Sequence, residues 1–187
     1  MALEACEQLE QVGVKPTHVA LQAGVGAFAG SAQAFVSNFY GGDSPTSFIV
    51  EPHVADCYYR SALRGDGVPV NVSGEMKTIM AGLACGEPSP VSWDILRNMS
   101  DYFVTISDAH AERAMRVLGA PLVGDARVVS GESGASGMGF LLELLTNEGL
   151  ADLREDAGIG KDSHFLVFST EGDTDPQNYL DVVWGGL

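Results

Sequence analysis

The glycine-rich turn after the first apolar segment is the part of the sequence best suited to binding an anion. Residues 17–22 have the apolar character of a buried strand, and they lead into Gly24-Val25-Gly26 and a small-residue helix that ends near Tyr40. Glycine adopts positive φ and lets a ligand approach the main chain, while successive N–H groups at a helix N-terminus attract anions. The loop is therefore a candidate phosphate site, with close packing of the chain as the plainer interpretation.

Two other phosphate-binding motifs match this loop less well. A P-loop requires Gly-Lys-Ser/Thr, whereas residues 29–31 contain no lysine. A dinucleotide-binding loop would have glycines at 24, 26 and, one position late, 30, but Glu51 lies only roughly where the acidic residue that binds ribose belongs. A free-standing Rossmann-like module that binds a nucleotide or a phosphorylated metabolite remains the alternative.

The other polar residues indicate no metal site and no hydrolase. Asp173 and Asp175 follow the last strand, where a cation could bind them, but two acidic residues that open a helix are more often caps. The histidines are too dispersed for a zinc site, and no Gly-x-Ser-x-Gly elbow surrounds Ser133 or Ser136. We therefore predict no metal ligand.

Helical and strand-like segments alternate along the chain, which predicts a three-layer α/β/α fold with a mainly parallel sheet. We expect residues 1–187 to form a single lobe. The expected strands are 17–22, 47–50, 102–106 and 164–168, and the expected helices include 3–11, 54–63, 77–84, 93–99, one that begins after Ser107-Asp108, one through 140–145 and a short one through 179–183.

Composition excludes some classes of function. A net charge of −15 with only ten lysine and arginine residues argues against binding to nucleic acid, and no apolar stretch is long enough to span a bilayer. The three cysteines have no metal-ligand spacing, which favours reduced thiols in a cytoplasmic protein.

Several motifs, in order along the chain, resemble those of the fold-type II pyridoxal-phosphate enzymes, the group of tryptophan synthase β and threonine dehydratase. The resembling segments are residues 22–30, 48–52, 78–86, 130–135 and 169–175. Within this group, residues 80–88, 130–134 and 169–175 are most similar to the diaminopropionate ammonia-lyases.

The resemblance implies a fold like the large domain of the fold-type II enzymes and pyridoxal 5′-phosphate as the cofactor, and it assigns roles to six residues. The main-chain N–H groups of Gly24, Val25, Gly26 and Ala27 would bind the phosphate. Ser169 would lie beside the pyridine nitrogen, where a neutral hydroxyl favours β-elimination, and Glu132 would lie close to the ring. The plainer interpretations are a hydroxyl at a strand end for Ser169 and a carboxylate at a helix N-terminus for Glu132.

The resemblance also implies an activity, which is α,β-elimination from 2,3-diaminopropionate to pyruvate and ammonia by a homodimeric lyase. We expect this chain to be its C-terminal cofactor-binding part and to be inactive alone, because the catalytic lysine of the family precedes the glycine loop. Here Lys15 adjoins a proline, and Lys77 and Lys161 stand among polar residues, so none suits a lysine of depressed pKa. The catalytic lysine is expected outside this chain.

Overall fold

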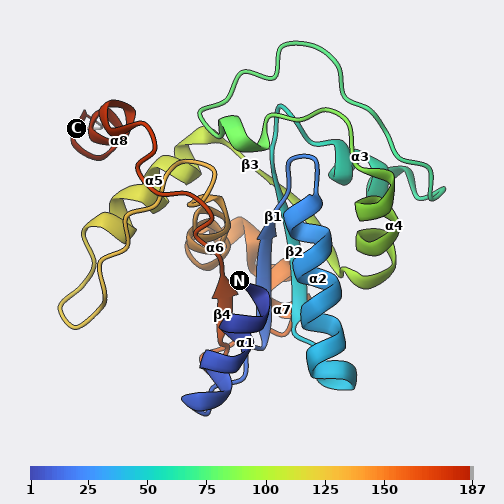
Figure 1. The fold of residues 1–187 in the computed structure, drawn as a ribbon, viewed down its shortest axis with the longest axis horizontal. Helices are drawn as coiled ribbons and strands as arrows, with labels where there is room; N and C mark the ends of the chain where they lie inside the picture. Colours follow the sequence, from blue (N-terminus) through green and yellow to red (C-terminus); the bar gives the residue numbers. More distant parts are fainter. Residues whose placement is uncertain (186–187) are drawn as a thin grey trace.

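Four parallel strands in the order β3-β2-β1-β4 form the centre of the structure, a computed structural model that describes residues 1–185 (Figure 1). The strands are β1 (His18–Gln22), β2 (Thr46–Pro52), β3 (Tyr102–Ile106) and β4 (Phe165–Val167). Ala20 of β1 pairs with Phe48 on one side and with Val167 on the other. The predicted parallel α/β sheet is confirmed.

The two central strands owe their place to continuous apolar sequence. Every residue of β1 is buried, and so is every residue of β2 after Thr46. Strands that are covered by helices on both faces read as near-continuous apolar runs, as these do.

The first four helices cover one face of the sheet. These are α1 (Ala2–Gln11), α2 (Ala27–Tyr40), α3 (Cys57–Arg64) and α4 (Pro90–Met99). Val19, Leu21 and Ile49 point from the sheet into this layer, where they pack with Tyr58 and Trp93. The helices approach closely, since a Cβ built on Gly30 of α2 would lie 3.1 Å from Ser92 of α4.

The remaining helices lie on the opposite face and beyond it. Ala20, Phe48 and Val50 pack there against α5 (Asp108–Gly119), α6 (Ser136–Thr146) and the short helix α7 (Ala151–Asp156). The last helix, α8 (Pro176–Gly185), packs on α5 and α6 through Tyr179 and Val182, away from the sheet. These helices complete the three predicted layers.

The expected helix over residues 77–84 is wrong. Only a single 3₁₀ turn, η2 (Ala81–Leu83), forms there. The hydroxyl of Thr78 accepts the N–H of Met80 and donates to the carboxylate of Asp108, which also accepts the N–H of Ile79 at 3.2 Å. These bonds give the backbone partners that a helix would otherwise have supplied.

Other boundaries differ by a few residues. Helix α3 begins at Cys57 rather than 54, and α4 begins earlier than expected because Ser89 caps it and Pro90 takes its first position. Strand β4 is shorter than expected, and α7 was not predicted. The carboxyl end of β1, from which the glycine loop leaves the sheet, lies at residue 22 as predicted.

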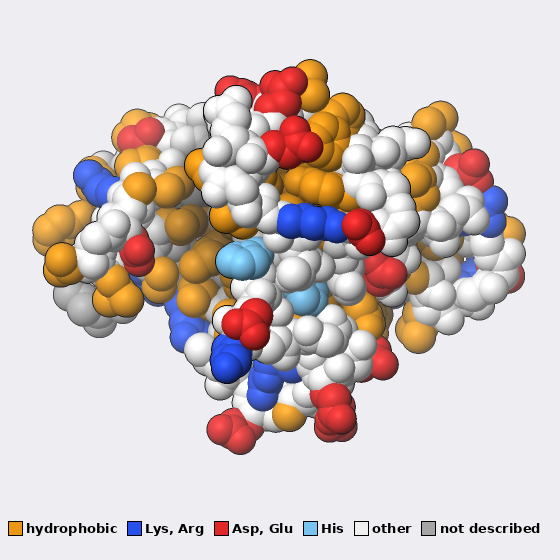
Figure 2. Space-filling view, turned by 90° about the horizontal axis from the view of Figure 1, so that it is seen from below, with side chains coloured by type: hydrophobic (Ala, Val, Ile, Leu, Met, Phe, Trp, Pro, Cys, Tyr) orange, Lys and Arg blue, Asp and Glu red, His pale blue; other side chains and the backbone are white. Residues whose placement is uncertain are grey.

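The long segment between α3 and α4 arches over the upper edge of the sheet in Figure 1, where the parallel strands end. Figure 2 shows the molecule from below the view of Figure 1, where lysine and arginine side chains are scattered among acidic and apolar ones. No helix within residues 1–185 has both the length and the apolar composition needed to cross a membrane.

Candidate functional site

The glycine loop lies at the carboxyl end of β1, between Gln22 and the first residue of α2, Ala27. Gly26 holds the N-cap position with φ of +90°, a conformation that favours glycine. Within residues 1–185, the N–H groups of Gly24, Val25, Gly26 and Ala27 donate no hydrogen bond to another group of the protein. Four consecutive amides at a helix N-terminus are therefore free to bind an anion.

Both glycines of the loop are required by close contacts, and Gly26 is required by its conformation as well. A Cβ on Gly24 would lie 2.9 Å from the carbonyl oxygen of Gly82, and a Cβ on Gly26 would overlap the hydroxyl of Tyr58. The packing interpretation therefore holds for both glycines, and it is compatible with free amides in the same loop.

A pocket of about 500 Å³ opens above these amides. It brings the glycine loop together with the 3₁₀ turn η2, the end of the loop that precedes α6, and the segment after β4. Its lining residues are Gln22, Gly24, Val25, Gly26, Ala27, Phe28, Gly82, Leu83, Ser133, Thr170, Glu171, Gly172 and Thr174.

Polar contacts tie these segments to one another. The Gln22 side chain donates to the carbonyl of Phe168 at 2.8 Å and to the Thr170 hydroxyl at 2.9 Å. The Glu171 carboxylate accepts the N–H of Ser133 at 2.9 Å. The Oε1 of Gln22 is buried and has no partner among residues 1–185.

The other two predicted cofactor residues do not line this pocket. The Ser169 hydroxyl donates to the Ser130 hydroxyl at 2.9 Å and faces a smaller, mostly apolar hollow of about 150 Å³. Glu132 is buried, and its carboxylate accepts a hydrogen bond from the Asn178 side chain on α8. Thr170, which follows Ser169, and Ser133, which follows Glu132, line the pocket instead.

The lysines lie away from the amides. Lys15 pairs with Asp43 at 2.9 Å, and Lys161 is exposed just before β4, so both lie towards the amino ends of the strands. Lys77 is exposed and is not among the pocket residues. Asp175 accepts the N–H of Asn178 at 3.1 Å, which confirms it as a cap of α8.

Glu51, the acidic residue considered for ribose binding, has another use. It is fully buried, and its two carboxylate oxygens accept the N–H groups of Tyr58 at 2.9 Å and Tyr59 at 2.7 Å, at the start of α3. Burial raises the pKa of its carboxyl to about 7, and the two N–H groups limit that rise. The carboxyl therefore anchors a helix and is not free for a nucleotide.

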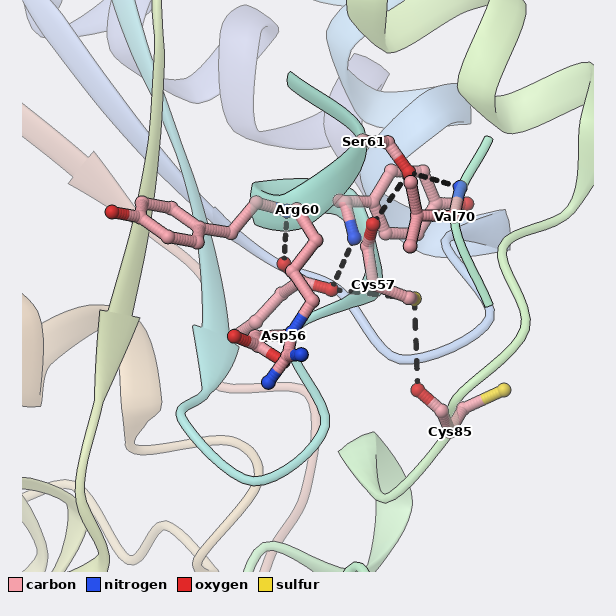
Figure 3. Close-up of polar contacts among 9 residues, drawn as sticks. Asp56, Cys57, Arg60, Ser61, Val70 and Cys85 are labelled. Carbon is pink, nitrogen blue, oxygen red and sulfur yellow. Dashed lines mark hydrogen bonds and ion pairs between the residues drawn. The ribbon is translucent and has the colours of Figure 1, made fainter. Parts of the chain in front are cut away.

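The surroundings of this anchor are shown in Figure 3. The Cys57 sulfur lies 3.5 Å from Glu51 Oε1 and 3.6 Å from the carbonyl oxygen of Cys85, and Arg60 folds back on Asp56 at 2.7 Å. Burial raises the pKa of the Cys57 thiol far above its ordinary value. A thiol held neutral in this way is unreactive, so Cys57 is structural.

Sequence reasoning missed several residues of the site. Gln22 carried a usable signal, since it is the last residue of a parallel strand, where ligands of such sheets bind. Tyr58 carried none, because its hydroxyl reaches the carbonyl of Val25, 33 positions away, only once α3 has packed.

The fold and the site together define an α/β domain that presents free amides to an anionic group at the carboxyl edge of its sheet. Residues 1–158 match the family model described as pyridoxal-phosphate dependent enzyme. The chain belongs to this family.

Individual relatives give a finer comparison. The chain is 50% identical over 186 residues to a diaminopropionate ammonia-lyase of Escherichia coli strain K12, a match that covers 100% of the chain. It superimposes on the holo structure of diaminopropionate ammonia lyase from Escherichia coli with a TM-score of 0.90 at 48% identity over 99% of the chain. A structure of the Escherichia coli enzyme with an aminoacrylate-PLP azomethine reaction intermediate gives a TM-score of 0.88.

These matches cover only part of each relative. The chain spans 46% of the length of the curated Escherichia coli enzyme and 45% of the holo structure. A Rossmann-like nucleotide module, the alternative from the sequence, is not favoured by these comparisons.

Proposed function

We propose that this chain is the cofactor-binding part of a pyridoxal-phosphate-dependent ammonia-lyase, and that the complete protein converts 2,3-diaminopropionate to pyruvate and ammonia by α,β-elimination. The observation that carries the proposal is the row of free N–H groups from Gly24 to Ala27, which faces a pocket at the carboxyl edge of the sheet. Identity of 50% to an enzyme named for this activity supports the substrate.

The residues present fit a cofactor that ends in a phosphate. Four amides at a helix N-terminus match a dianion, and the lack of Cβ atoms at Gly24 and Gly26 lets the loop pack against η2 and Tyr58 in the conformation that exposes these amides. The pocket offers no lysine or arginine among its described lining residues, so peptide dipoles would provide the attraction. When bound, pyridoxal phosphate supplies the electron sink that lets the substrate lose its α-proton and its β-amino group.

Ser169 and Glu132 remain proposed partners of the cofactor ring, on the resemblance of their motifs. Thr170 is added to them, because its hydroxyl lines the pocket next to Ser169 and is held by Gln22 at 2.9 Å. The catalytic lysine is proposed to lie outside residues 1–187.

The assembly and location of the complete protein are part of the same proposal, which is a cytoplasmic homodimer. Cys6, Cys57 and Cys85 are all free thiols, which agrees with a reducing compartment. The exposed side chains of Leu122, Val123 and Trp184 offer apolar surface for a subunit contact.

The substrate assignment is tested by measuring pyruvate release by the complete natural polypeptide, saturated with pyridoxal phosphate. Equal concentrations of 2,3-diaminopropionate, serine and threonine are compared by kcat/KM. We expect 2,3-diaminopropionate to give the highest value. A protein that acts on serine or threonine but not on 2,3-diaminopropionate contradicts the substrate, and one that acts on none of them contradicts the proposed function.

A further inference from the structure

The peptide group between Val25 and Gly26 is fixed from behind the glycine loop. Its carbonyl oxygen accepts two hydrogen bonds, one from the Tyr58 hydroxyl at 2.7 Å and one from the N–H of Ser89 at 3.0 Å. In a planar trans peptide the C=O and the N–H point in opposite directions. Because the oxygen is drawn towards α3 and the start of α4, the N–H of Gly26 points to the other side, where the pocket lies.

Tyr58 is held firmly enough to fix this orientation. Its side chain is fully buried, and its ring packs near Trp93 with centroids 6.1 Å apart. Its own N–H is bound by the buried carboxyl of Glu51 at the end of β2. Contacts therefore run from a central strand through the first turn of α3 to the carbonyl of Val25.

Because residue 26 is glycine, the orientation of the Val25–Gly26 peptide depends on the hydrogen bonds to its carbonyl oxygen. A peptide bonded to glycine rotates more freely than others, because glycine populates positive and negative φ about equally. If this peptide rotated, its oxygen would face the pocket and would repel an anion that the N–H now attracts. The tyrosine hydroxyl opposes that rotation, since turning the carbonyl away would leave the buried hydroxyl without its acceptor.

We propose that Tyr58 is a positioning residue for phosphate binding: its hydroxyl, together with the amide of Ser89, holds the Val25–Gly26 peptide so that the Gly26 N–H faces the ligand. This inference deepens the proposed function and rests on it. Tyr58 does not contact the ligand itself and acts through the peptide that does.

The test compares affinities for pyridoxal 5′-phosphate and for pyridoxal, which lacks the phosphate. The ratio of the two dissociation constants reports on phosphate recognition and is insensitive to a general loosening of the site. It is measured for the complete natural polypeptide and for the variants Tyr58→Phe and Tyr59→Phe. Tyr59 is a matched control because its hydroxyl, at the neighbouring position, makes no hydrogen bond within residues 1–185.

We expect Tyr58→Phe to lower the preference for the phosphorylated ligand by about tenfold, the effect of one charge-assisted hydrogen bond. Tyr59→Phe should keep the wild-type ratio. A Tyr58→Phe protein with the wild-type ratio overturns the proposal, even if both of its affinities fall together. A wild-type protein that binds pyridoxal as tightly as pyridoxal phosphate overturns the phosphate site itself, so the two failures are distinguishable.

The N–H of Ser89 is the second donor to the Val25 carbonyl, and removing it gives an independent test. This test remains valid if the Tyr58→Phe protein does not fold. Ser89→Pro removes the N–H that bonds Val25 and suits the local φ of −60°, whereas Ser89→Ala keeps the N–H and removes only the side-chain cap of α4. We expect the ratio to fall in Ser89→Pro and to stay unchanged in Ser89→Ala. Equal ratios in these two variants overturn the proposal.

Discussion

The carboxylate of Glu51, at the end of a central strand, accepts the backbone N–H of Tyr59 at 2.7 Å and so caps a helix to which it does not belong. Helix α3 has its own N-cap residue, Asp56, but that side chain makes no capping bond and pairs with Arg60. A buried acid from the sheet has therefore replaced the local cap. This arrangement fixes the helix that carries Tyr58 to the strand beside the glycine loop.

The buried acid makes stability depend on pH. The pKa of Glu51 rises from 4.5 to about 7 on folding, so the folded protein binds a proton more tightly than the unfolded chain does. The contribution of Glu51 to the free energy of unfolding is complete below pH 4.5. It is lost as the pH rises through 7, the pKa of the folded state. At 1.36 kcal/mol per pKa unit, the loss is on the order of 3 kcal/mol.

The measurement is the free energy of urea unfolding of the wild type and of Glu51→Gln between pH 4.5 and 8. The variant cannot titrate at this position, so subtracting the two curves removes the effect of all other groups. We expect the advantage of the wild type to shrink as the pH rises across this window. An advantage that grows with pH would show instead that the ionised carboxylate is the stabilising form.

The close approach of Gly24 to Gly82 predicts a second effect. In Gly24→Ala the new Cβ would lie 2.9 Å from a backbone oxygen and 3.0 Å from the Cα of Leu83, and neither atom can move without its loop. We expect a loss of about 1–3 kcal/mol in unfolding free energy from overpacking. We also expect at least about tenfold weaker binding of pyridoxal phosphate, because the phosphate amides shift with the loop.

Gly42→Ala is the control for this variant, since nothing lies within 4 Å of a Cβ at that position. It should leave both the unfolding free energy and the cofactor titration unchanged. If Gly24→Ala binds pyridoxal phosphate as the wild type does, the loop is not the phosphate site.

The sequence was informative where a feature is local. The apolar runs around Val19 and Ile49 predicted buried parallel strands, and the glycines at 24 and 26 predicted the turn that places free amides at a helix start. These features depend on backbone conformation and on burial of adjacent residues, both of which the residue types report directly.

Features that depend on contacts between distant segments were not predictable. Ile79 and Leu83 are spaced like the apolar face of a helix, but Asp108, 29 and 30 positions from its partners, binds this segment in another conformation. The support of Val25 by Tyr58 likewise spans 33 positions. A single sequence gives no sign of such pairs until the order of the strands is known.

The contact between Thr78 and Asp108 predicts the effect of a third substitution. Thr78→Val keeps the shape of the side chain but removes the hydroxyl that bonds Asp108 and accepts the N–H of Met80. We expect the unfolding free energy to fall by about 1–3 kcal/mol, because partly buried groups lose their hydrogen-bond partner. Hydrogen exchange should also become faster in η2, whose residues Gly82 and Leu83 line the pocket.

Thr105→Val on β3 is the matched control, since the Thr105 hydroxyl makes no hydrogen bond within residues 1–185. This substitution should change the unfolding free energy by less than about 0.5 kcal/mol, as is usual away from such contacts. If the two variants lose the same free energy, the hydroxyl of Thr78 contributes nothing through Asp108.

The positions of the lysines predict where the cofactor becomes attached. Lys15 is paired with Asp43, and Lys77 and Lys161 are exposed, so none lies in the buried site that a Schiff-base lysine needs. The complete polypeptide is incubated with pyridoxal phosphate, reduced with borohydride and mapped by peptide mass spectrometry. We expect stoichiometric labelling of one lysine outside residues 1–187.

The same treatment of the isolated chain should give only sparse labelling, spread over its exposed lysines. Stoichiometric labelling confined to Lys77 or to Lys161 would place the catalytic lysine within this chain and would refute its assignment as the part that only binds the cofactor.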